Sequence, residues 1–381
     1  MKKIFLVVND LVTATNFRKD LMKTLHNLGH DVAVISPSQS NFVNSSEVLN
    51  DSQKLSFRHI HIFINRVSLN PFASLKYILF LSKILKSERP DYVLLYTPKI
   101  VIFGSIASRI AGVHKVYSTI NGLGYAFASQ SFKAKFLSVL LKALYKVALS
   151  FNAKVFFQNS DDRNYFLTNN LVDNNKSLLI NGSGVNINEF QPRAKLDQRY
   201  IFLMIARIIP EKGVYEFLQA ARMVKQKYPN IVFQLLGPLE SESPAILPKT
   251  VSDWNKEGAI EYISQKSDVK PYIANCNTFV LPSYREGTPK SVLEAMAMGK
   301  PIITSDVPGC REPVIDGVNG YLVPPRNSHL LGESMLAIYE DEDFAKLAGV
   351  KSIEIIKDKY DVIKVNKFFM QALEIASKKN V

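Results

Sequence analysis

Two glutamates, Glu286 and Glu294, stand eight positions apart in the stretch YREGTPKSVLEAMAMGKP. Two carboxylates in one motif are the residue types of a catalytic acid and base. The residues between them predict a helix, because Thr288 can cap a first turn, Pro289 fits the first helical position and Gly299 is typical of a helix end. Glu294 then lies about 9 Å along the helix from the cap. The two carboxylates are therefore held apart.

The predicted helix start suits an anion. Backbone N–H groups at Thr288, Lys290 and Ser291 point out of the first turn and can bind a diphosphate, while Gly287 allows close approach. The glutamates then address hydroxyls on either side of that diphosphate, one set on a sugar and one on a ribose. The spacing favours recognition of such a ligand over paired proton transfer. The structural alternative is two surface glutamates on a helix.

Two basic residues follow an apolar strand in FLMIARIIPEKGVYEF. The strand is predicted to end at Ala206, so Arg207 and Lys212 occupy the loop at its carboxyl end, where α/β sheets bind ligands. Arg grips phosphate oxygens with two donors and Lys supplies a mobile charge, so together they could neutralise a leaving diphosphate. Surface basic residues are common, and in isolation this pattern is weak.

Short apolar runs alternate with helical patterns along the 381 residues. Continuous apolar strands between helices are typical of parallel sheets covered on both faces, so the predicted fold class is α/β with two doubly wound domains. Glycines, asparagines and a proline break the pattern before the second half, which places the junction near Pro192. The predicted domains are residues 1–192, residues 193–360, and a helix in residues 361–381 that returns to the first domain.

The formal net charge of +13 is unevenly distributed. Residues 1–190 hold 22 Lys and Arg against 11 Asp and Glu, or +11, which leaves 25 against 23, or +2, for the rest. This asymmetry favours an anionic partner of the N-terminal half, with a membrane or nucleic acid as candidates. A solvated basic face is the alternative. Aromatic and basic residues are not interleaved as a nucleic-acid stacking surface requires.

Several classes of protein are disfavoured by composition. The two cysteines are too few for a disulfide framework, and neither they nor the six histidines have metal-ligand spacing. No metal-binding D-x-D cluster is evident, so no metal and no cofactor are expected. The N-terminus has no cleavage site, and no stretch reaches the ~18 apolar residues of a spanning helix. A reducing cytosolic compartment is predicted.

Two helical stretches in the basic half are apolar and carry lysines. In SFKAKFLSVLLKALYKVALS the lysines fall within about 40° of one another on a helical wheel, with the leucines and Val147 on the opposite side. PFASLKYILFLSKILKSER repeats the pattern. Packing on the sheet explains either helix alone, and contact with an anionic membrane is the second interpretation. The lysines concerned are Lys135, Lys142 and Lys146 in the first stretch and Lys76, Lys83 and Lys86 in the second.

The segments ARIIPEKG, SYREGTPKSVLEAMAMGKPIITSDVPG and DGVNGYLVPP together resemble the retaining family-four glycosyltransferases. The resemblance covers essentially the whole chain and implies the GT-B architecture, with two Rossmann-like domains facing across a cleft. It implies a UDP-sugar donor bound by the second domain, with Glu286 near the sugar and Glu294 on the ribose. The catalytic residues implied are Arg207, Lys212 and Glu286, and the donor-binding residues are Gly287, Thr288, Pro289, Lys290, Ser291, Glu294 and Asn121.

Less specific matches lie in the first half. RVSLNPFASLKYILFLSKILK, YTPK and STINGLGYAF resemble enzymes, including N-acetylgalactosaminyltransferases, that extend undecaprenyl-diphosphate-linked sugars in bacterial glycan assembly. This implies transfer of an N-acetylhexosamine or hexose to a lipid-linked saccharide by a peripheral protein at the inner face of the cell membrane. The acceptor-binding residues implied are Asn16, Arg18, Arg66 and Lys99, and the membrane contacts are Lys76, Lys83, Lys135, Lys142 and Lys146.

The sequence departs from the family pattern at several positions. Many members have a histidine where Asn121 stands, and an asparagine can hydrogen-bond a hydroxyl but cannot carry a proton. Asn186 replaces a usual aspartate, and the loop VNDLVTATNFR lacks the family's paired glycines. Histidine-dependent chemistry is therefore not expected, and the favoured mechanism is front-face substitution assisted by the leaving diphosphate.

Other functions fit less well. A glycosidase needs two carboxyls across one bond, and a dinucleotide-dependent oxidoreductase needs a third glycine that GLGYAF lacks. A two-domain solute-binding protein should be exported, and the sequence shows no signal peptide. A glycosyltransferase with a soluble acceptor and a non-enzymatic nucleic-acid-binding protein remain as alternatives.

Overall fold

The computed structural model describes residues 1–37, 57–63, 71–122, 132–239 and 246–375, without the side chains of residues 132–136. The chain divides into two compact units. The first unit is Met1–Ser183 with the chain from Asn366 onward, and the second is Gly184–Val365. The limits predicted from the sequence are residues 192 and 360.

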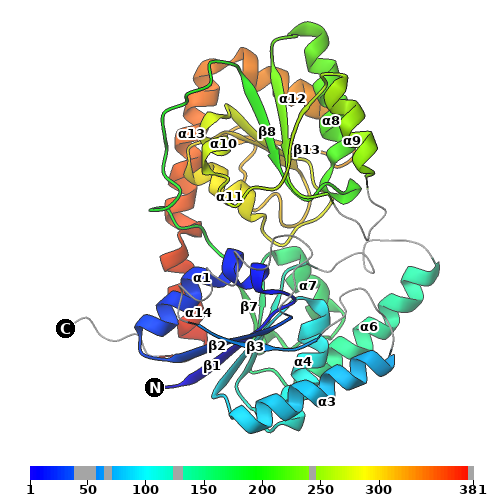
Figure 1. Ribbon diagram of the computed structural model, residues 1–381, viewed down its shortest axis with the longest axis vertical. Helices are drawn as coiled ribbons and strands as arrows, with labels where there is room; N and C mark the ends of the chain where they lie inside the picture. The colour runs from blue at the N-terminus through cyan, green and yellow to red at the C-terminus, as the bar shows by residue number, and fades with distance from the viewer. Residues whose placement is uncertain (38–56, 64–70, 123–131, 240–245, 376–381) are drawn as a thin grey trace. The chain divides into compact units, whose positions relative to one another are not determined.

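The first unit is built on a parallel sheet of seven strands in the order β3-β2-β1-β4-β5-β6-β7 (Figure 1). Strands β4 and β5 are buried along their whole length, as expected of parallel strands covered on both faces. The strand order reverses between β1 and β4, and the carboxyl ends at such a reversal are where α/β sheets bind ligands. The strands are β1 (Lys3–Val7), β2 (Asp31–Ser36), β3 (Arg58–His61), β4 (Tyr92–Tyr96), β5 (Val116–Ile120), β6 (Lys154–Phe157) and β7 (Ser177–Leu179).

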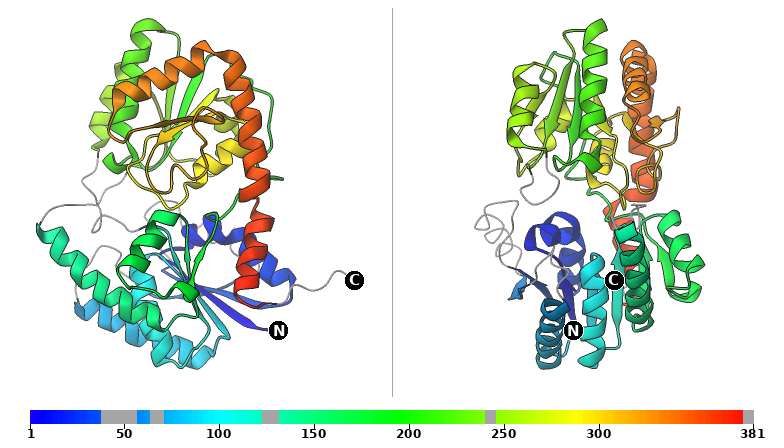
Figure 2. Two further views of the ribbon diagram at one scale, coloured as in Figure 1. Left: turned by 180° about the vertical axis from the view of Figure 1, so that it is seen from behind. Right: turned by 90° about the vertical axis from the view of Figure 1, so that its right-hand side faces the viewer.

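Helices cover both faces of this sheet. Helices α1 and α14 lie on one face, whereas α3, α4 and α6 lie together on the other (Figures 1 and 2). Phe369 of α14 stacks on Phe156 of β6, with ring centroids 4.4 Å apart. This contact ties the end of the described chain to the first sheet. The helices are α1 (Leu11–Asn27), α3 (Pro71–Glu88), α4 (Pro98–Ile110), α6 (Phe132–Ser150), α7 (Ser160–Thr168) and α14 (Val362–Ala372).

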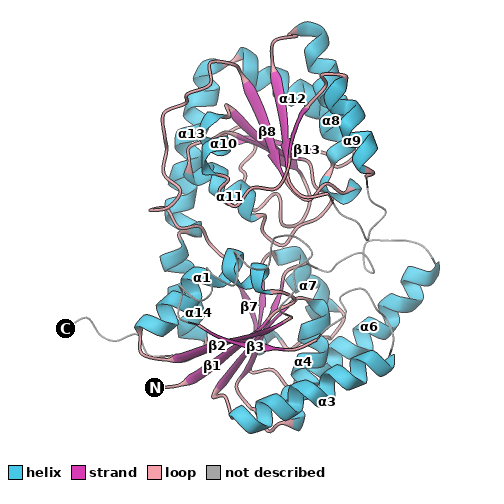
Figure 3. Ribbon diagram, viewed as in Figure 1, coloured by secondary structure: helices cyan, strands magenta, loops and turns pink. Residues whose placement is uncertain are grey.

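The second unit has a parallel sheet of six strands in the order β10-β9-β8-β11-β12-β13 (Figure 3). Its strand order reverses between β8 and β11. The strands are β8 (Ile201–Ile205), β9 (Val232–Leu236), β10 (Glu261–Ile263), β11 (Thr278–Leu281), β12 (Ile302–Ser305) and β13 (Gly320–Val323). The helices are α8 (Val214–Lys227), α9 (Pro248–Lys256), α10 (Lys270–Asn275), α11 (Lys290–Ala297), α12 (Ser328–Glu340) and α13 (Glu342–Ile355), with a 3-10 turn η2 (Pro210–Lys212). The α/β class with two doubly wound units is confirmed.

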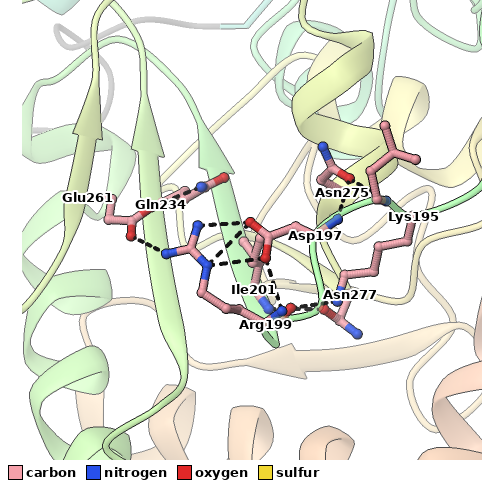
Figure 4. A network of polar contacts seen from close by, with 9 residues as sticks. Lys195, Asp197, Arg199, Ile201, Gln234, Glu261, Asn275 and Asn277 are labelled. Atoms are coloured by element: carbon pink, nitrogen blue, oxygen red, sulfur yellow. Dashed lines mark hydrogen bonds and ion pairs between the residues drawn. The ribbon is translucent and has the colours of Figure 1, made fainter.

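A polar network fixes the chain that enters the second sheet at the amino end of β8 (Figure 4). The Arg199 guanidinium donates to Asp197 at 2.8 Å and to Glu261 at 2.7 Å. Asn277 Oδ1 accepts from the backbone N–H of Ile201 at 2.9 Å. The hydrogen bonds from Arg199 lower the pKa of Asp197 to about 2. These contacts lie at the opposite edge of the sheet from the carboxyl ends of β8 and β11.

Candidate active site

The loops that follow β8 and β11 meet at the strand reversal of the second unit. The backbone N–H of Tyr284 donates to the carbonyl of Glu211 at 2.9 Å. Gly213 has a φ of 75°, and a Cβ at this position would lie 2.1 Å from the carbonyl oxygen of Pro282. Only glycine allows this approach. The two stretches that the sequence analysis singled out are thereby brought side by side.

Lys212 and Glu286 form the centre of this cluster. The Lys212 ammonium donates to Glu286 Oε1, and the two side chains are 18% and 14% exposed. Ser283 Oγ donates to the same carboxylate oxygen at 2.7 Å. Two residues predicted separately from two motifs are therefore direct partners. Ser283 was not predicted, because a serine that precedes a motif carries no distinguishing pattern.

A third loop, after β12, fixes the backbone around Glu286. The N–H of Glu286 donates to the carbonyl of Pro308 at 3.1 Å. Gly309 has a φ of 89°, and a Cβ there would lie 2.2 Å from the carbonyl oxygen of Glu286. The Gly309 N–H in turn donates to Glu312 Oε2 at 2.7 Å. The Glu286 carboxylate is thus presented by a loop that is held on two sides.

Helix α11 begins at Lys290, later than predicted. Pro289 is the N-cap with a φ of −72° and a ψ of 112°, and its own side chain makes no capping hydrogen bond. The predicted start is wrong by one residue, because Pro289 rather than Thr288 is the N-cap: Pro289 is extended and its own carbonyl accepts the first intrahelical hydrogen bonds. The predicted end is confirmed, since Gly299 follows the helix with a φ of 74°. The amides of the first turn, which include Ser291, still form the positive end of the helix.

Glu294 lies on α11 and has a different partner from Glu286. Its carboxylate is 3.4 Å from the Lys290 ammonium, and the residue is only 9% exposed. Burial raises the pKa of Glu294, opposed in part by Lys290. The two glutamates therefore have separate partners and lie on separate elements.

The other residues predicted to bind the donor lie at the same edge of the second sheet or, for Asn121, after β5 in the first sheet. Arg207 directly follows the end of β8 and its side chain is exposed. Gly287 is buried and Thr288 is half-buried in the loop before α11. Asn121 follows β5 in the first unit, and its Oδ1 is buried with no hydrogen-bond partner among the described residues. The structure thus places all of these residues beyond the carboxyl ends of strands.

A tyrosine that the sequence analysis did not single out supports the same loop. The Tyr284 hydroxyl donates to Glu216 Oε1 at 2.8 Å, and the Arg326 guanidinium carbon lies 4.6 Å from the centroid of its ring. Burial, with a smaller effect from Glu216, raises the pKa of Tyr284 to about 12. Tyr284 and Glu216 are 68 positions apart in the chain. No sequence pattern joins them.

The predicted acceptor-binding residues have different surroundings. Asn16 is exposed on α1, whereas Arg18 on the same helix is buried. Lys99 lies in the first turn of α4, where burial lowers its pKa. Arg66 lies outside the described residues.

The outer face of α3 is both basic and apolar. Lys76 and Lys83 are exposed there beside Phe72, which is 81% exposed, and Leu79, which is 56% exposed. The helix buries its other side, which includes Leu81. The residues of this α3 outer face, which line a shallow hollow, are Phe72, Leu75, Lys76, Leu79, Phe80 and Lys83.

Helix α6 differs from its predicted division into a lysine side and an apolar side. Val147 is 53% exposed beside the exposed Lys146. The buried side is instead centred on Tyr145, which packs on Phe166 at 5.0 Å between ring centroids. Ala148 and Leu149 are buried on the same side of the helix, whereas Leu140 is 50% exposed. Lys142 is half-buried and donates to Asn169 at 2.7 Å, and the side chain of Lys135 lies outside the described residues.

Metal sites and membrane-spanning helices were sought throughout the described part of the chain. No group of three His, Cys, Asp or Glu side chains in it could hold a metal ion. No helix in it is long and apolar enough to cross a membrane. Metal independence stays a prediction.

Comparison with known proteins decides the family. Residues 186–352 match the model of "Glycosyl transferases group 1", and residues 3–159 match that of "Glycosyl transferase 4-like". The chain is 32% identical over 340 residues to the N,N'-diacetylbacillosaminyl-diphospho-undecaprenol α-1,3-N-acetylgalactosaminyltransferase of Campylobacter jejuni. This match covers 86% of each protein. The chain belongs to the group 1 glycosyltransferases. The cluster around Lys212 therefore belongs to a glycosyltransferase.

Further relatives agree with this assignment. The glycosyltransferase is 26% identical to the UDP-Gal:α-D-GlcNAc-diphosphoundecaprenol α-1,3-galactosyltransferase of Escherichia coli, over 84% of this chain and 87% of the relative. Two crystal structures share its fold. A glycosyltransferase from Rickettsia africae has a TM-score of 0.74 and 20% sequence identity, and the match covers 99% of each chain. Anabaena HepE in complex with UDP-glucose has a TM-score of 0.79 and 17% sequence identity, and the match covers 99% of this chain and 100% of HepE. The predicted GT-B fold is confirmed, and the interpretation as a nucleic-acid-binding protein is not favoured.

Proposed function

We propose that this glycosyltransferase moves a sugar, with retention of configuration, from a UDP-sugar to a saccharide linked to a polyprenyl diphosphate. The printed activities of the Campylobacter and Escherichia relatives, which both act on undecaprenyl-diphosphate-linked sugars, support this acceptor class. The observation that carries the proposal is the similarity to the Campylobacter enzyme, which spans 86% of both chains rather than the second unit alone.

The donor diphosphate is proposed to bind at the strand reversal of the second unit. Lys212 uses one of its three donors for Glu286 and keeps two for phosphate oxygens. Arg207 and the positive end of α11 add charge from two further sides. Glu286 then contacts the donor sugar, and Glu294 accepts hydrogen bonds from the ribose hydroxyls.

Transfer is proposed to follow a front-face substitution. The bond between the anomeric carbon and the diphosphate oxygen breaks as the acceptor hydroxyl adds on the same face of the sugar. The acceptor proton passes to the departing diphosphate oxygen. Arg207, Lys212 and the helix start stabilise the negative charge that develops on the leaving group. The proposed mechanism uses no metal and no cofactor, and neither glutamate is its general base.

The acceptor lipid is proposed to be reached from a membrane surface, at the inner face of the cell membrane. The α3 outer face supports this proposal. Its exposed apolar side chains can enter the boundary of the bilayer while Lys76 and Lys83 attract anionic head groups. Lys146 and the exposed Val147 of α6 offer the same combination on a helix that packs against α4, as α3 does.

The direct experiment offers a panel of UDP-sugars together with undecaprenyl-diphosphate monosaccharides to the purified protein. Mass spectrometry then identifies the lipid-linked product, and NMR of its new linkage reports the anomeric configuration. We expect one donor to extend a lipid-linked monosaccharide by one sugar, with retention. Inversion of configuration would refute the proposed mechanism, and no transfer to any lipid-linked acceptor would refute the proposed acceptor class.

A further inference from the structure

Arg18 is a buried cation that has no counter-ion among the residues that the structure describes. The residue is 6% exposed, and its guanidinium carbon lies 4.2 Å from the centroid of the Tyr96 ring. No described residue forms an ion pair or a hydrogen bond with its guanidinium. Burial lowers the pKa of Arg18, and the neighbouring Tyr96 opposes this effect. A buried charge in this state is unfavourable unless a further group pairs with it.

The position of Arg18 is where a ligand is expected in the first unit. Tyr96 is the last residue of β4, and β4 pairs with β1 at the strand reversal. Side chains on a helix lean toward its N-terminus, so Arg18 extends from α1 toward the carboxyl ends of these two strands. The loops after β1 and β4 are joined here, because Thr97 Oγ1 donates to Asn9 Oδ1 at 2.8 Å.

The beginning of α4 adds donors and positive charge at the same edge. Thr97 is the N-cap of α4, and its φ of 74° is a backbone conformation that residues other than glycine rarely adopt. The Thr97 side chain makes no capping hydrogen bond. Strained residues of this kind concentrate at functional sites. Lys99 lies in the first turn. The Tyr96 hydroxyl is buried and has no hydrogen-bond partner among the described residues.

Stacking on Tyr96 accounts for only part of this arrangement. A guanidinium carries five N–H donors in its plane, and contact of its face with a ring leaves those donors unused. The planar fork of an arginine matches the oxygens of a phosphate, and a helix N-terminus binds the same kind of group. The ligand that satisfies both the fork and the helix end is an anion with several oxygens.

We propose that Arg18, Tyr96 and the first turn of α4 form a second diphosphate site, which binds the diphosphate of the polyprenyl-linked acceptor. This inference rests on the proposed function for the identity of the acceptor. The donor diphosphate has its own site at the strand reversal of the second unit. Each unit then binds one diphosphate at the reversal of its own sheet.

The first test measures binding of inorganic pyrophosphate by calorimetry while saturating UDP occupies the donor site. Wild-type protein is expected to bind pyrophosphate, and Arg18→Gln to bind it about tenfold more weakly or worse, because the charge-assisted hydrogen bonds are lost. Lys23→Gln, which removes a lysine from the same helix, is the matched control and should bind as wild type does. Absence of binding to wild type, or equal binding to Arg18→Gln, would overturn the proposal.

The second test separates the two sources of a diphosphate. With a lipid-linked acceptor, Arg18→Gln is expected to raise the acceptor KM about tenfold and to leave the donor KM within about twofold. A raised donor KM with an unchanged acceptor KM would assign the site to the nucleotide and overturn the proposal. Because pyrophosphate binding does not depend on turnover, a wild-type protein that binds pyrophosphate without transferring sugar would instead refute the proposed function.

Two milder variants guard against loss of folding. Arg18→Lys keeps the charge but not the fork, and Tyr96→Phe removes only the unpartnered hydroxyl. Both variants are expected to retain the melting temperature of the wild type within about 2 °C and to bind pyrophosphate several-fold more weakly. Wild-type affinity in both variants would mean that Arg18 only packs on Tyr96.

Discussion

At the scale of single residues, the shared carboxylate of Glu286 explains how the site is organised. It holds Lys212 and Ser283 at once, and these three residues come from two loops that are separated in sequence. The motif spacing predicted which residues matter, but it could not predict that Lys212 and Glu286 are partners 74 positions apart. Only the strand order, which places β8 beside β11, brings them together.

Loss of either Arg207 or Lys212, the two basic residues of the loop after β8, should slow catalysis. Lys212→Ala and Arg207→Ala are each expected to lower kcat about 100-fold or more, as for removal of a donor to a developing oxyanion. Lys249→Ala, which removes an exposed lysine of the second unit, is the control and should leave kcat unchanged. Turnover close to wild type in both variants would remove the leaving-group role from this loop.

Replacement of Glu294 should change both the thermal stability of the protein and its affinity for UDP. Burial raises its folded-state pKa, so the native state binds more protons than the unfolded state between the two pKa values, and wild-type stability falls as pH rises through that window. Glu294→Gln buries no charge. We expect it to melt at a higher temperature than wild type near pH 8, with a smaller difference near pH 4, and to bind UDP about tenfold more weakly.

These two readouts distinguish a ribose contact from a purely structural residue. Glu342→Gln, at an exposed glutamate of α13, should change neither the melting temperature nor UDP affinity. Unchanged UDP affinity in Glu294→Gln would remove Glu294 from the nucleotide site, whatever its effect on stability.

At the scale of elements, the strands were predictable and the orientation of helices was less so. Long apolar runs such as those of β4 and β8 are recognisable in the sequence, whereas β7 has only three residues, too few to form a pattern. A helical wheel ranks side chains by polarity but does not weigh their packing, so it did not predict that α6 buries Tyr145, Ala148 and Leu149 and exposes Val147. The same limitation hid the apolar character of the α3 outer face.

That face provides a prediction about membrane binding. Phe72→Ser with Leu79→Ser should reduce sedimentation with anionic liposomes several-fold, because exposed apolar area is lost from the face that carries Lys76 and Lys83.

The matched control changes exposed apolar residues elsewhere. Leu347 and Val350 of α13 are 55% and 52% exposed, and their double replacement by serine should leave liposome binding unchanged. Equal loss in both double variants would indicate nonspecific adsorption and contradict the role of α3.

At the scale of the whole molecule, both units place candidate anion sites at the reversal of a parallel sheet. The uneven charge predicted an anionic partner for the first half of the chain, and the resemblance implied Arg18 as an acceptor residue. Neither could predict that Arg18 is buried on Tyr96 with no counter-ion in the described part of the chain, because that follows from the approach of α1 to β4. The fold was predictable from periodicity, and the contacts between distant loops were not.

The first unit also depends on the far end of the chain. Phe369 of α14 is 2% exposed and stacks on Phe156, whereas its neighbour Phe368 is 40% exposed. Phe369→Ala is expected to lower the free energy of unfolding by about 3–5 kcal/mol, and Phe368→Ala by much less. Chemical denaturation measures both. Equal effects would mean that the stacking contributes nothing specific to the first unit.

The central claim is that the acceptor is recognised through its lipid diphosphate. The most direct measurement compares kcat/KM for one saccharide presented on a polyprenyl diphosphate and as the free saccharide, with the same UDP-sugar. We predict a preference for the lipid-linked form of about 100-fold or more, because binding energy from the diphosphate is available only there. Equal kcat/KM values for the two acceptors would contradict the account.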